Sequence, residues 1–198
     1  MAPQSYSVLT VCLGRSPMAE AVLLAEAKKR PNLDLKIDSA GTGAYHTGEK
    51  ADPRWVRVER AAHINASWRQ LVLHRVIADS RTISTCKQHG IPCPSIARKV
   101  RDSDFTDLDY ILAMDQSNLQ ALQARKPRGS KARLALFGTF DPDLLLASPG
   151  SRKVRPAPIE DPYYGGRDGF ETAYTQCVKY AKGFLDFLEQ GGGDVPNL

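Results

Sequence analysis

Short β-rich runs alternate with helical segments along this chain, and that alternation restricts its fold more than any other feature. Four runs have the apolar and β-branched content of strands, at residues 6–11, 33–39, 110–114 and 134–137. Helical patterns are found at residues 16–30, 82–89, 115–125 and 169–189. Strands that are separated by helices pair in parallel, and the helices cover the sheet. We therefore expect an α/β fold of three layers, a four-stranded parallel sheet flanked by helices on both faces.

Length and composition indicate one globular domain. The chain has 198 residues, of which 42% are apolar and 25% charged, and these values exclude collagen, coiled coils and extensive disorder. No apolar run approaches the ~20 residues of a membrane helix, and residues 1–7 lack the positive cluster of a signal peptide. Four cysteines do not make a disulfide framework in a chain of this length. We predict a cytoplasmic protein whose single domain spans 1–198, with a tail from about 191.

The formal net charge of +5 suits an anionic substrate without identifying one. A basic cluster falls in a turn that contains Pro and Gly, and consists of Arg125, Lys126, Arg128, Lys131 and Arg133. A nucleic-acid site would need basic residues on one face, so a solvated loop is the better interpretation of this cluster. We expect neither nucleic acid nor membrane among the partners.

Cys12 stands between the first predicted strand and the helix that begins at Ser16. Ligands of parallel α/β proteins bind outside the carboxyl ends of the strands, and the positive potential of a helix N-terminus favours a thiolate there. Arg15 adds a guanidinium fork that matches phosphate oxygens, and Ser16 can cap the helix or donate to the sulfur. These groups together predict a thiolate that attacks a bound phosphate ester. The alternative is that Cys12 is a buried structural cysteine.

The residues around Cys12 resemble the strand-one signature of the low-molecular-weight protein tyrosine phosphatases, V-C-L-G-N-I-C-R-S-P-x-A-E. Here this signature reads Val11-Cys12-Leu13-Gly14 followed by Arg15-Ser16-Pro17-Met18-Ala19-Glu20. The similarity continues through residues 38–42, 45–49, 52–54, 109–115 with Asn118, and 161–165.

The resemblance implies a two-step phosphatase that acts on phosphotyrosine proteins and small aryl phosphates, as a monomer and without a metal or other cofactor. Cys12 matches the nucleophile that forms a phosphocysteine, Arg15 the arginine that holds the phosphoryl oxygens, and Asp161 the general acid. The implied substrate-binding residues are Leu13, Gly14, Ser16, Tyr45, Tyr163 and Tyr164. Asp115 is expected to cap a helix rather than to take part in catalysis.

The chain departs from the family signature between Cys12 and Arg15, where only Leu13 and Gly14 stand and N-I-C is absent. A residue spans at most about 3.3–3.6 Å, so the short loop is too small to surround a phosphate with backbone N–H groups. Ser39 thereby lacks the Asn with which it is expected to bond. Ser95 stands where many members have the His of an H-x-A-R string.

A second departure is an insertion at about 55–81, with no clean hydrophobic period. Deleting it would join Arg54 to Thr82, as family members read. A retained intron, together with a mis-set splice boundary at N-I-C, is our hypothesis, and a genuine surface insertion is the alternative. The sequence of the transcript decides between them.

Other functions fit parts of the chain. A phosphate-binding relative without catalysis fits the short loop. An arsenate reductase shares the fold and could use Cys86 and Cys93 as a redox pair, but in those relatives the pair follows the third strand, whereas here it precedes residues 110–114. A zinc site formed by Cys86, His89 and Cys93 lacks a fourth neighbouring ligand.

Overall fold

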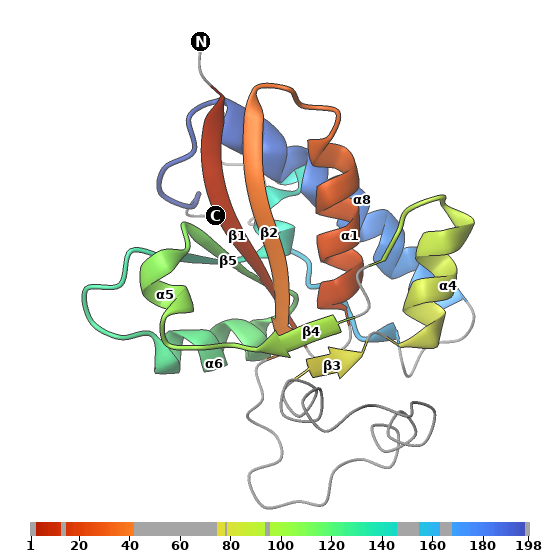
Figure 1. Ribbon diagram of the computed structural model, residues 1–198, viewed down its shortest axis with the longest axis horizontal. Coiled ribbons are helices and arrows are strands. Elements are labelled where there is room, and N and C mark those ends of the chain that lie inside the picture. Colours follow the sequence, from red (N-terminus) through yellow and green to blue (C-terminus); the bar gives the residue numbers. More distant parts are fainter. Residues whose placement is uncertain are drawn as a thin grey trace, which may run out of the picture.

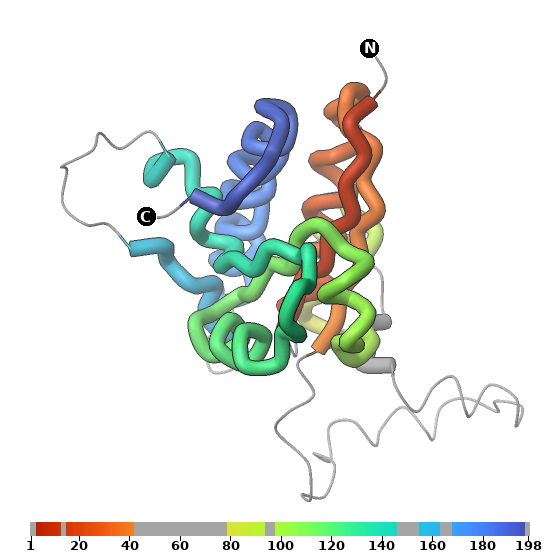
Figure 2. The backbone as a smooth tube through the Cα atoms, turned by 90° about the vertical axis from the view of Figure 1, so that its left-hand side faces the viewer, coloured from red at the N-terminus to blue at the C-terminus, as the bar shows by residue number. Residues whose placement is uncertain are grey.

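The computed structural model of the protein describes residues 3–12, 15–41, 75–77, 79–93, 96–145, 155–162 and 168–196. A central sheet separates two layers of helices (Figures 1 and 2). On one face lie α1 (Ser16–Ala27), α4 (Ser80–Gln88) and α8 (Asp168–Glu189). On the other face lie α5 (Asp104–Asp107) and α6 (Gln116–Arg125). The expected three-layer α/β architecture is confirmed.

The sheet has six strands in the order β3-β4-β2-β1-β5-β6. Their bounds are Gln4–Val11 (β1), Leu33–Gly41 (β2), Arg75–Ile77 (β3), Ile96–Lys99 (β4), Tyr110–Ala113 (β5) and Arg133–Leu136 (β6). Five strands are parallel, and β3 runs antiparallel to β4 at the edge. The prediction of four parallel strands was therefore wrong. The parallel strand that was not predicted is β4. It is short and ends in two basic residues, so it has no apolar alternation that would mark it as a strand.

The core follows the period of two in the central strands. In β1 the side chain of Val8 belongs to the core under α1 and α8, and Leu9 to the core under α5 and α6. Tyr110 and Ile111 divide in the same way in β5. Since successive side chains of a strand alternate between faces, Cys12 joins the core on the α1 and α8 side.

The N-terminus of α1 differs from its prediction. Arg15 occupies the N-cap position without a side-chain capping bond, and Ser16 is already helical. Pro17 stands in the first turn, where its missing N–H leaves no bond unmade. Ser16 is therefore not the cap, and its hydroxyl donates instead to backbone carbonyls of Cys12 and Ala40.

Two short helices occupy the region after β6. The 3₁₀ helix η2 spans Phe137–Phe140, and α7 spans Pro142–Leu145. The amphipathic pattern of residues 169–189 is confirmed by α8, which buries Phe170, Cys177, Phe184 and Leu188. No helix within the described ranges is long and apolar enough to cross a membrane.

We predict that Gly183→Ala destabilises the fold, because α8 crosses η2 at this residue. A Cβ on Gly183 would overlap the carbonyl oxygen of Phe140. Overpacking of this kind costs about 1–3 kcal/mol, which urea unfolding measures directly. The control is Lys182→Ala, an exposed change on the same helix. Equal unfolding midpoints for the two variants would contradict the prediction.

Candidate active site

Cys12 lies at the carboxyl end of β1, between the ends of β2 and β5 in the sheet. Its backbone N–H donates to the carbonyl of Ala40 at 3.0 Å, which extends the strand pairing by one residue. The side chain is only 3% exposed. The sulfur is therefore held by rigid structure just where the first turn leaves the sheet.

The Arg15 guanidinium joins three segments of the chain around this sulfur. Its Nε donates to Cys12 Sγ at 3.0 Å, and one terminal nitrogen donates to Asp115 Oδ2 at 2.5 Å. The other terminal nitrogen donates to the carbonyl of Ile159. Burial would lower the pKa of Arg15, but Cys12 and Asp115 more than offset that effect and the net shift is upward. A permanent cation thus stands against the cysteine sulfur.

Asp115 has two tasks. One carboxylate oxygen caps α6, accepting from the N–H of Asn118 at 2.8 Å and from the hydroxyl of Ser117 at 2.7 Å. The other oxygen holds Arg15. Burial tends to raise the pKa of Asp115, but these bonds and the Arg15 charge lower it overall.

The capping role of Asp115 agrees with the sequence prediction, but its ion pair with Arg15 was missed. A signal for this pair was present. Asp115 closely follows a fully buried strand, as Cys12 follows β1, and parallel strands end at the same edge of a sheet.

Ser16 was predicted to donate to the sulfur of Cys12, but its hydroxyl donates to backbone carbonyl oxygens instead. Ser16 Oγ lies 2.9 Å from the carbonyl oxygen of Cys12 and 3.4 Å from that of Ala40. Thr10 Oγ1 in turn donates to the carbonyl of Ser16 at 3.1 Å. These buried bonds tie the N-terminus of α1 to the carboxyl ends of β1 and β2, so Ser16 helps to fix the backbone of Cys12.

Asp161 is exposed on the segment 155–162, which is anchored close to Arg15. Ile159, two residues earlier, donates its N–H to the carbonyl of Met114 at 2.9 Å and accepts from Arg15. The remaining predicted site residues lie outside the described ranges, namely Leu13, Gly14, Tyr45, Tyr163 and Tyr164.

Two buried polar groups beside the turn lack hydrogen bonds. Within the described part of the chain, neither Glu20 Oε2 nor Ser39 Oγ makes a hydrogen bond of good geometry, although the two side chains lie close to each other. Burial raises the pKa of Glu20 to about 7, and the nearby Ser39 hydroxyl offsets this only in part. Ser39 is the residue that the short loop was expected to deprive of a partner. Leu13 and Gly14 of that loop lie outside the described ranges, so this expectation stays a prediction.

The basic cluster makes contacts within the chain. Arg125 pairs with Asp102 at 2.8 Å, Lys131 with Asp109 at 3.3 Å and Arg133 with Asp194 at 3.3 Å. These ion pairs neutralise much of the local charge, which supports the interpretation of a solvated loop.

The zinc alternative has no support in the geometry. His89 Nε2 lies 2.7 Å from Glu171 Oε1, and the His89 ring stacks on Tyr174. Among the described residues no three His, Cys, Asp or Glu side chains are grouped so that they could hold a metal ion.

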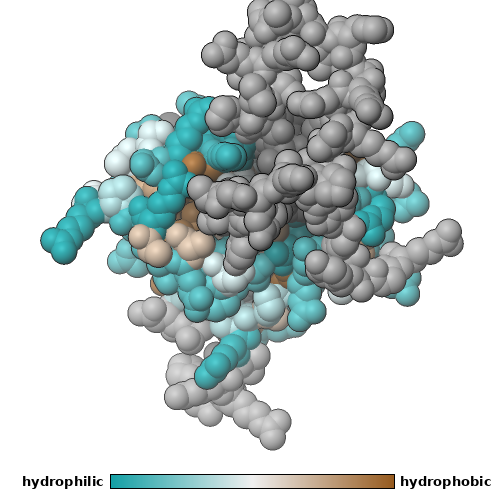
Figure 3. Space-filling view, turned by 90° about the horizontal axis from the view of Figure 1, so that it is seen from below, coloured by the Kyte–Doolittle hydropathy of each residue, from teal (hydrophilic) through white to brown (hydrophobic). Residues whose placement is uncertain are grey.

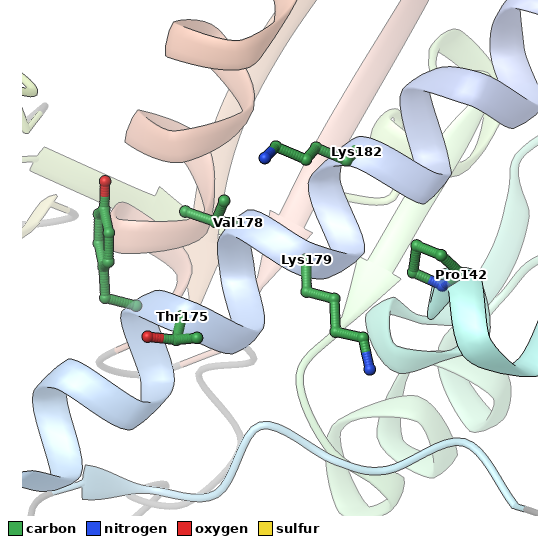
Figure 4. Close-up of a pocket in the computed structure, with 6 residues that line it drawn as sticks. Pro142, Thr175, Val178, Lys179 and Lys182 are labelled. Atoms are coloured by element: carbon green, nitrogen blue, oxygen red, sulfur yellow. The ribbon is translucent and has the colours of Figure 1, made fainter.

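A surface hollow of about 370 Å³ lies on α8 and is lined by Pro142, Tyr174, Thr175, Val178, Lys179 and Lys182 (Figure 4). Lys179 is paired with Asp141 at 2.8 Å and Asp143 at 2.6 Å. The hollow shares no lining residue with the site at Cys12. In the view from below in Figure 3, the described residues that are visible are mostly hydrophilic.

Comparisons with known proteins point to one family. The sequence profile described as "Low molecular weight phosphotyrosine protein phosphatase" matches residues 7–71 and 73–192. The Schizosaccharomyces pombe protein of that name is 40% identical over 188 residues, with 92% of this chain and 96% of the relative covered. The Homo sapiens protein is 36% identical over 188 residues, covering 91% and 94%.

Solved structures agree with these matches. A crystal structure of a protein tyrosine phosphatase from Entamoeba histolytica, with Hepes in its active site, superposes with a TM-score of 0.68 at 29% identity. The match covers 94% of this chain and 98% of that one.

The buried Glu20 generates a pH prediction. Its folded-state pKa of about 7 lies above the ordinary value for glutamate, about 4.3, so folding takes up a proton between these values. The stabilisation is fully present below about pH 4.3 and is lost as the pH rises to about 7. We expect Glu20→Gln to remove this loss, which amounts to about 3.5 kcal/mol over the full range and to about 2.5 kcal/mol between about pH 5 and about pH 8.

Urea unfolding of both proteins, at about pH 5 and about pH 8, measures the difference. The control is Glu26→Gln on the same helix, where the carboxylate pairs with Lys29 at 2.6 Å. Glu26→Gln should keep the wild-type pH dependence. An unchanged pH dependence in Glu20→Gln would show that Glu20 is ionised throughout.

Proposed function

Because the chain belongs to the low molecular weight phosphotyrosine protein phosphatase family, we propose that it hydrolyses phosphotyrosine monoesters through a phosphocysteine intermediate. The observation that carries the proposal is the 3.0 Å contact between Arg15 Nε and Cys12 Sγ at the carboxyl end of β1. A cation in that place stabilises a thiolate and offers a guanidinium to phosphoryl oxygens.

In the first step, Cys12 Sγ attacks phosphorus and the bond to the tyrosine oxygen breaks. Asp161 donates its proton to that leaving oxygen, so the phenol departs neutral. Arg15 faces the negative charge of the phosphoryl group throughout. In the second step Asp161 takes a proton from water, the water oxygen attacks phosphorus, and the thiolate leaves. The products are the phenol and inorganic phosphate, and no cofactor is needed.

The substrates proposed are phosphotyrosine-containing proteins and small aryl phosphates. The resemblance assigns the walls of the cleft to Tyr45, Tyr163 and Tyr164, whose flat rings suit an aromatic ester. The net charge of +5 favours an anionic partner. A monomer that acts in the cytoplasm remains part of this proposal.

The short loop argues for impaired turnover, and a phosphate-binding relative is the second candidate. All three nitrogens of Arg15 are already engaged, by Cys12, Asp115 and the Ile159 carbonyl. An incoming phosphoryl group must compete with these partners, and it meets fewer backbone N–H groups than the family signature provides. Each missing charge-assisted bond is worth about 1.5–3 kcal/mol.

The reductase alternative is not favoured. Cys86 and Cys93 follow the antiparallel β3 but still precede the third parallel strand of the chain, β4. The Asp161-Pro162-Tyr163-Tyr164 motif suits ester hydrolysis, because a leaving aryl oxygen needs a proton.

The proposal is tested first by Cys12→Ser. We expect hydrolysis of p-nitrophenyl phosphate and of a phosphotyrosine peptide to disappear while the circular dichroism spectrum is retained, because an alcohol replaces a far better nucleophile of similar size. The control is Cys93→Ser, a cysteine placed away from the proposed chemistry. Turnover that survives in Cys12→Ser would remove this residue from its role.

Asp161→Asn tests the general acid. We predict a loss of about 10²–10⁴-fold in the rate of phenyl phosphate cleavage, and a much smaller loss for esters whose leaving group needs no proton. Glu160→Gln, the neighbouring carboxyl, should leave both rates unchanged. A loss of the same size for every leaving group would mean that Asp161 acts in another way.

The short loop is tested by inserting Asn-Ile-Cys between Gly14 and Arg15. We expect kcat/KM for an aryl phosphate to rise by orders of magnitude. Each restored hydrogen bond stabilises the transition state, and every ~1.4 kcal/mol of that stabilisation raises the rate about tenfold. Inserting Gly-Gly-Gly controls for loop length alone. Comparable kcat/KM values with and without Asn-Ile-Cys would show that the short loop suffices.

A further inference from the structure

All four cysteines of the chain belong to or pack against one apolar cluster, between the sheet and helices α1, α4 and α8. Cys12, Cys86 and Cys177 are buried in it, and Cys93 is partly exposed at its edge. The proposed phosphatase reaction uses Cys12 alone. Cys86 and Cys93 are left without an assigned task.

The end of α4 brings Cys93 back toward Cys86. The N–H of Ile91 donates to the carbonyl of Cys86 at 2.9 Å, and that of Gly90 donates to Lys87 at 3.0 Å. Gly90 has a φ of +68°. This is a Schellman turn, which ends a helix and reverses the chain. The residues that follow it therefore pass beside the last turn of α4, on the side of the buried cluster.

The two thiols meet there. Cys93 hydrogen-bonds to the Cys86 sulfur, and this bond lowers the pKa of Cys86 while the pKa of Cys93 is raised. Cys93 Sγ also lies 3.7 Å from the carbonyl oxygen of Pro17, in the first turn of α1. The pair therefore consists of a buried sulfur, Cys86, and an adjacent, partly exposed thiol, Cys93, at the edge of the apolar cluster.

We propose that Cys86 and Cys93 are a redox modification site, at which a hydroperoxide closes a reversible disulfide between them. One thiolate attacks the peroxide oxygen, whose O–O bond breaks, giving a sulfenic acid and, after protonation, an alcohol, or water when the peroxide is hydrogen peroxide. The second thiol attacks that sulfur, the S–O bond breaks, and a water molecule leaves. The peroxide gains two electrons from the two sulfurs, and a thiol reductant reverses the reaction.

The other cysteines do not compete for this bond. Cys177 is fully buried, and burial raises its pKa to about 12, so it stays a thiol. The Cys12 sulfur faces the Nε of Arg15, whereas the thiol that Cys86 meets is that of Cys93. The disulfide would tie the C-terminal end of α4 to the residues that lead into β4. Its formation requires no phosphatase activity, so the inference stands independently of the proposed function.

The test is peptide mapping of the wild-type chain treated with stoichiometric hydrogen peroxide and then blocked with N-ethylmaleimide. Trypsin cleaves after Arg81, Lys87 and Arg98, so Cys86 lies in peptide 82–87 and Cys93 in peptide 88–98. We expect these two peptides to appear joined, with the loss of two hydrogens, and to separate after dithiothreitol. This measurement needs no variant and so does not depend on a variant's folding.

Two variants sharpen the result. Cys93→Ser should leave peptide 82–87 unlinked, whereas Cys12→Ser should retain the link between 82–87 and 88–98. A disulfide that contains Cys12 or Cys177 in the wild-type chain would overturn the proposal. Accumulation of a sulfinic acid on Cys86 or Cys93 without the link, or two unmodified peptides after peroxide, would overturn it as well.

Discussion

The buried guanidinium of Arg15 is the group on which the arrangement of the site depends. A buried charge is costly unless it is paired and hydrogen-bonded, and Arg15 is 7% exposed. Its partners come from the end of β1, the N-terminus of α6 and the segment 155–162. These three segments are far apart in the chain, so the cation is satisfied only in the complete fold. The same contact that stabilises the fold therefore places a cation on the sulfur of Cys12.

The central strands were predictable because burial dictates their composition. In β5 both faces are covered by helices, and the strand reads as an apolar run. In β1 only the last four residues are fully buried, and these are apolar except for Thr10. β4 carries Arg98, which a sequence analysis counts as polar. In the structure Arg98 is satisfied by Asp38 at 2.8 Å and by Asp104 at 2.8 Å. These ion pairs allow a charged residue within the strand. Because their partners lie in other elements, the local sequence pattern around Arg98 does not predict them.

The candidate site was predictable where one segment carries it and not where several segments meet. Cys12 and Arg15 share one turn, so the short motif places them together. The pair of Arg15 and Asp115 depends on β5 being the neighbour of β1, and strand order is a property of the whole sheet. The direction of the Ser16 hydroxyl was likewise decided by carbonyl groups of Cys12 and Ala40, which become neighbours only when β1 pairs with β2.

The buried polar atoms of Glu20 and Ser39 lie beside the place where the chain departs from the family signature. An unsatisfied buried polar group costs about 1–3 kcal/mol, so a chain retains one only where its partner has been lost or lies elsewhere. Ser39 is fully buried, and within the described ranges its hydroxyl has only the nearby Glu20 carboxyl to face, without a hydrogen bond of good geometry. The family signature places Asn in the loop that this chain lacks, and that Asn is the partner which Ser39 was expected to have. The resemblance thus predicts that the shortened loop loses N–H groups on the phosphate side and the hydrogen-bond partner of Ser39 on the sheet side.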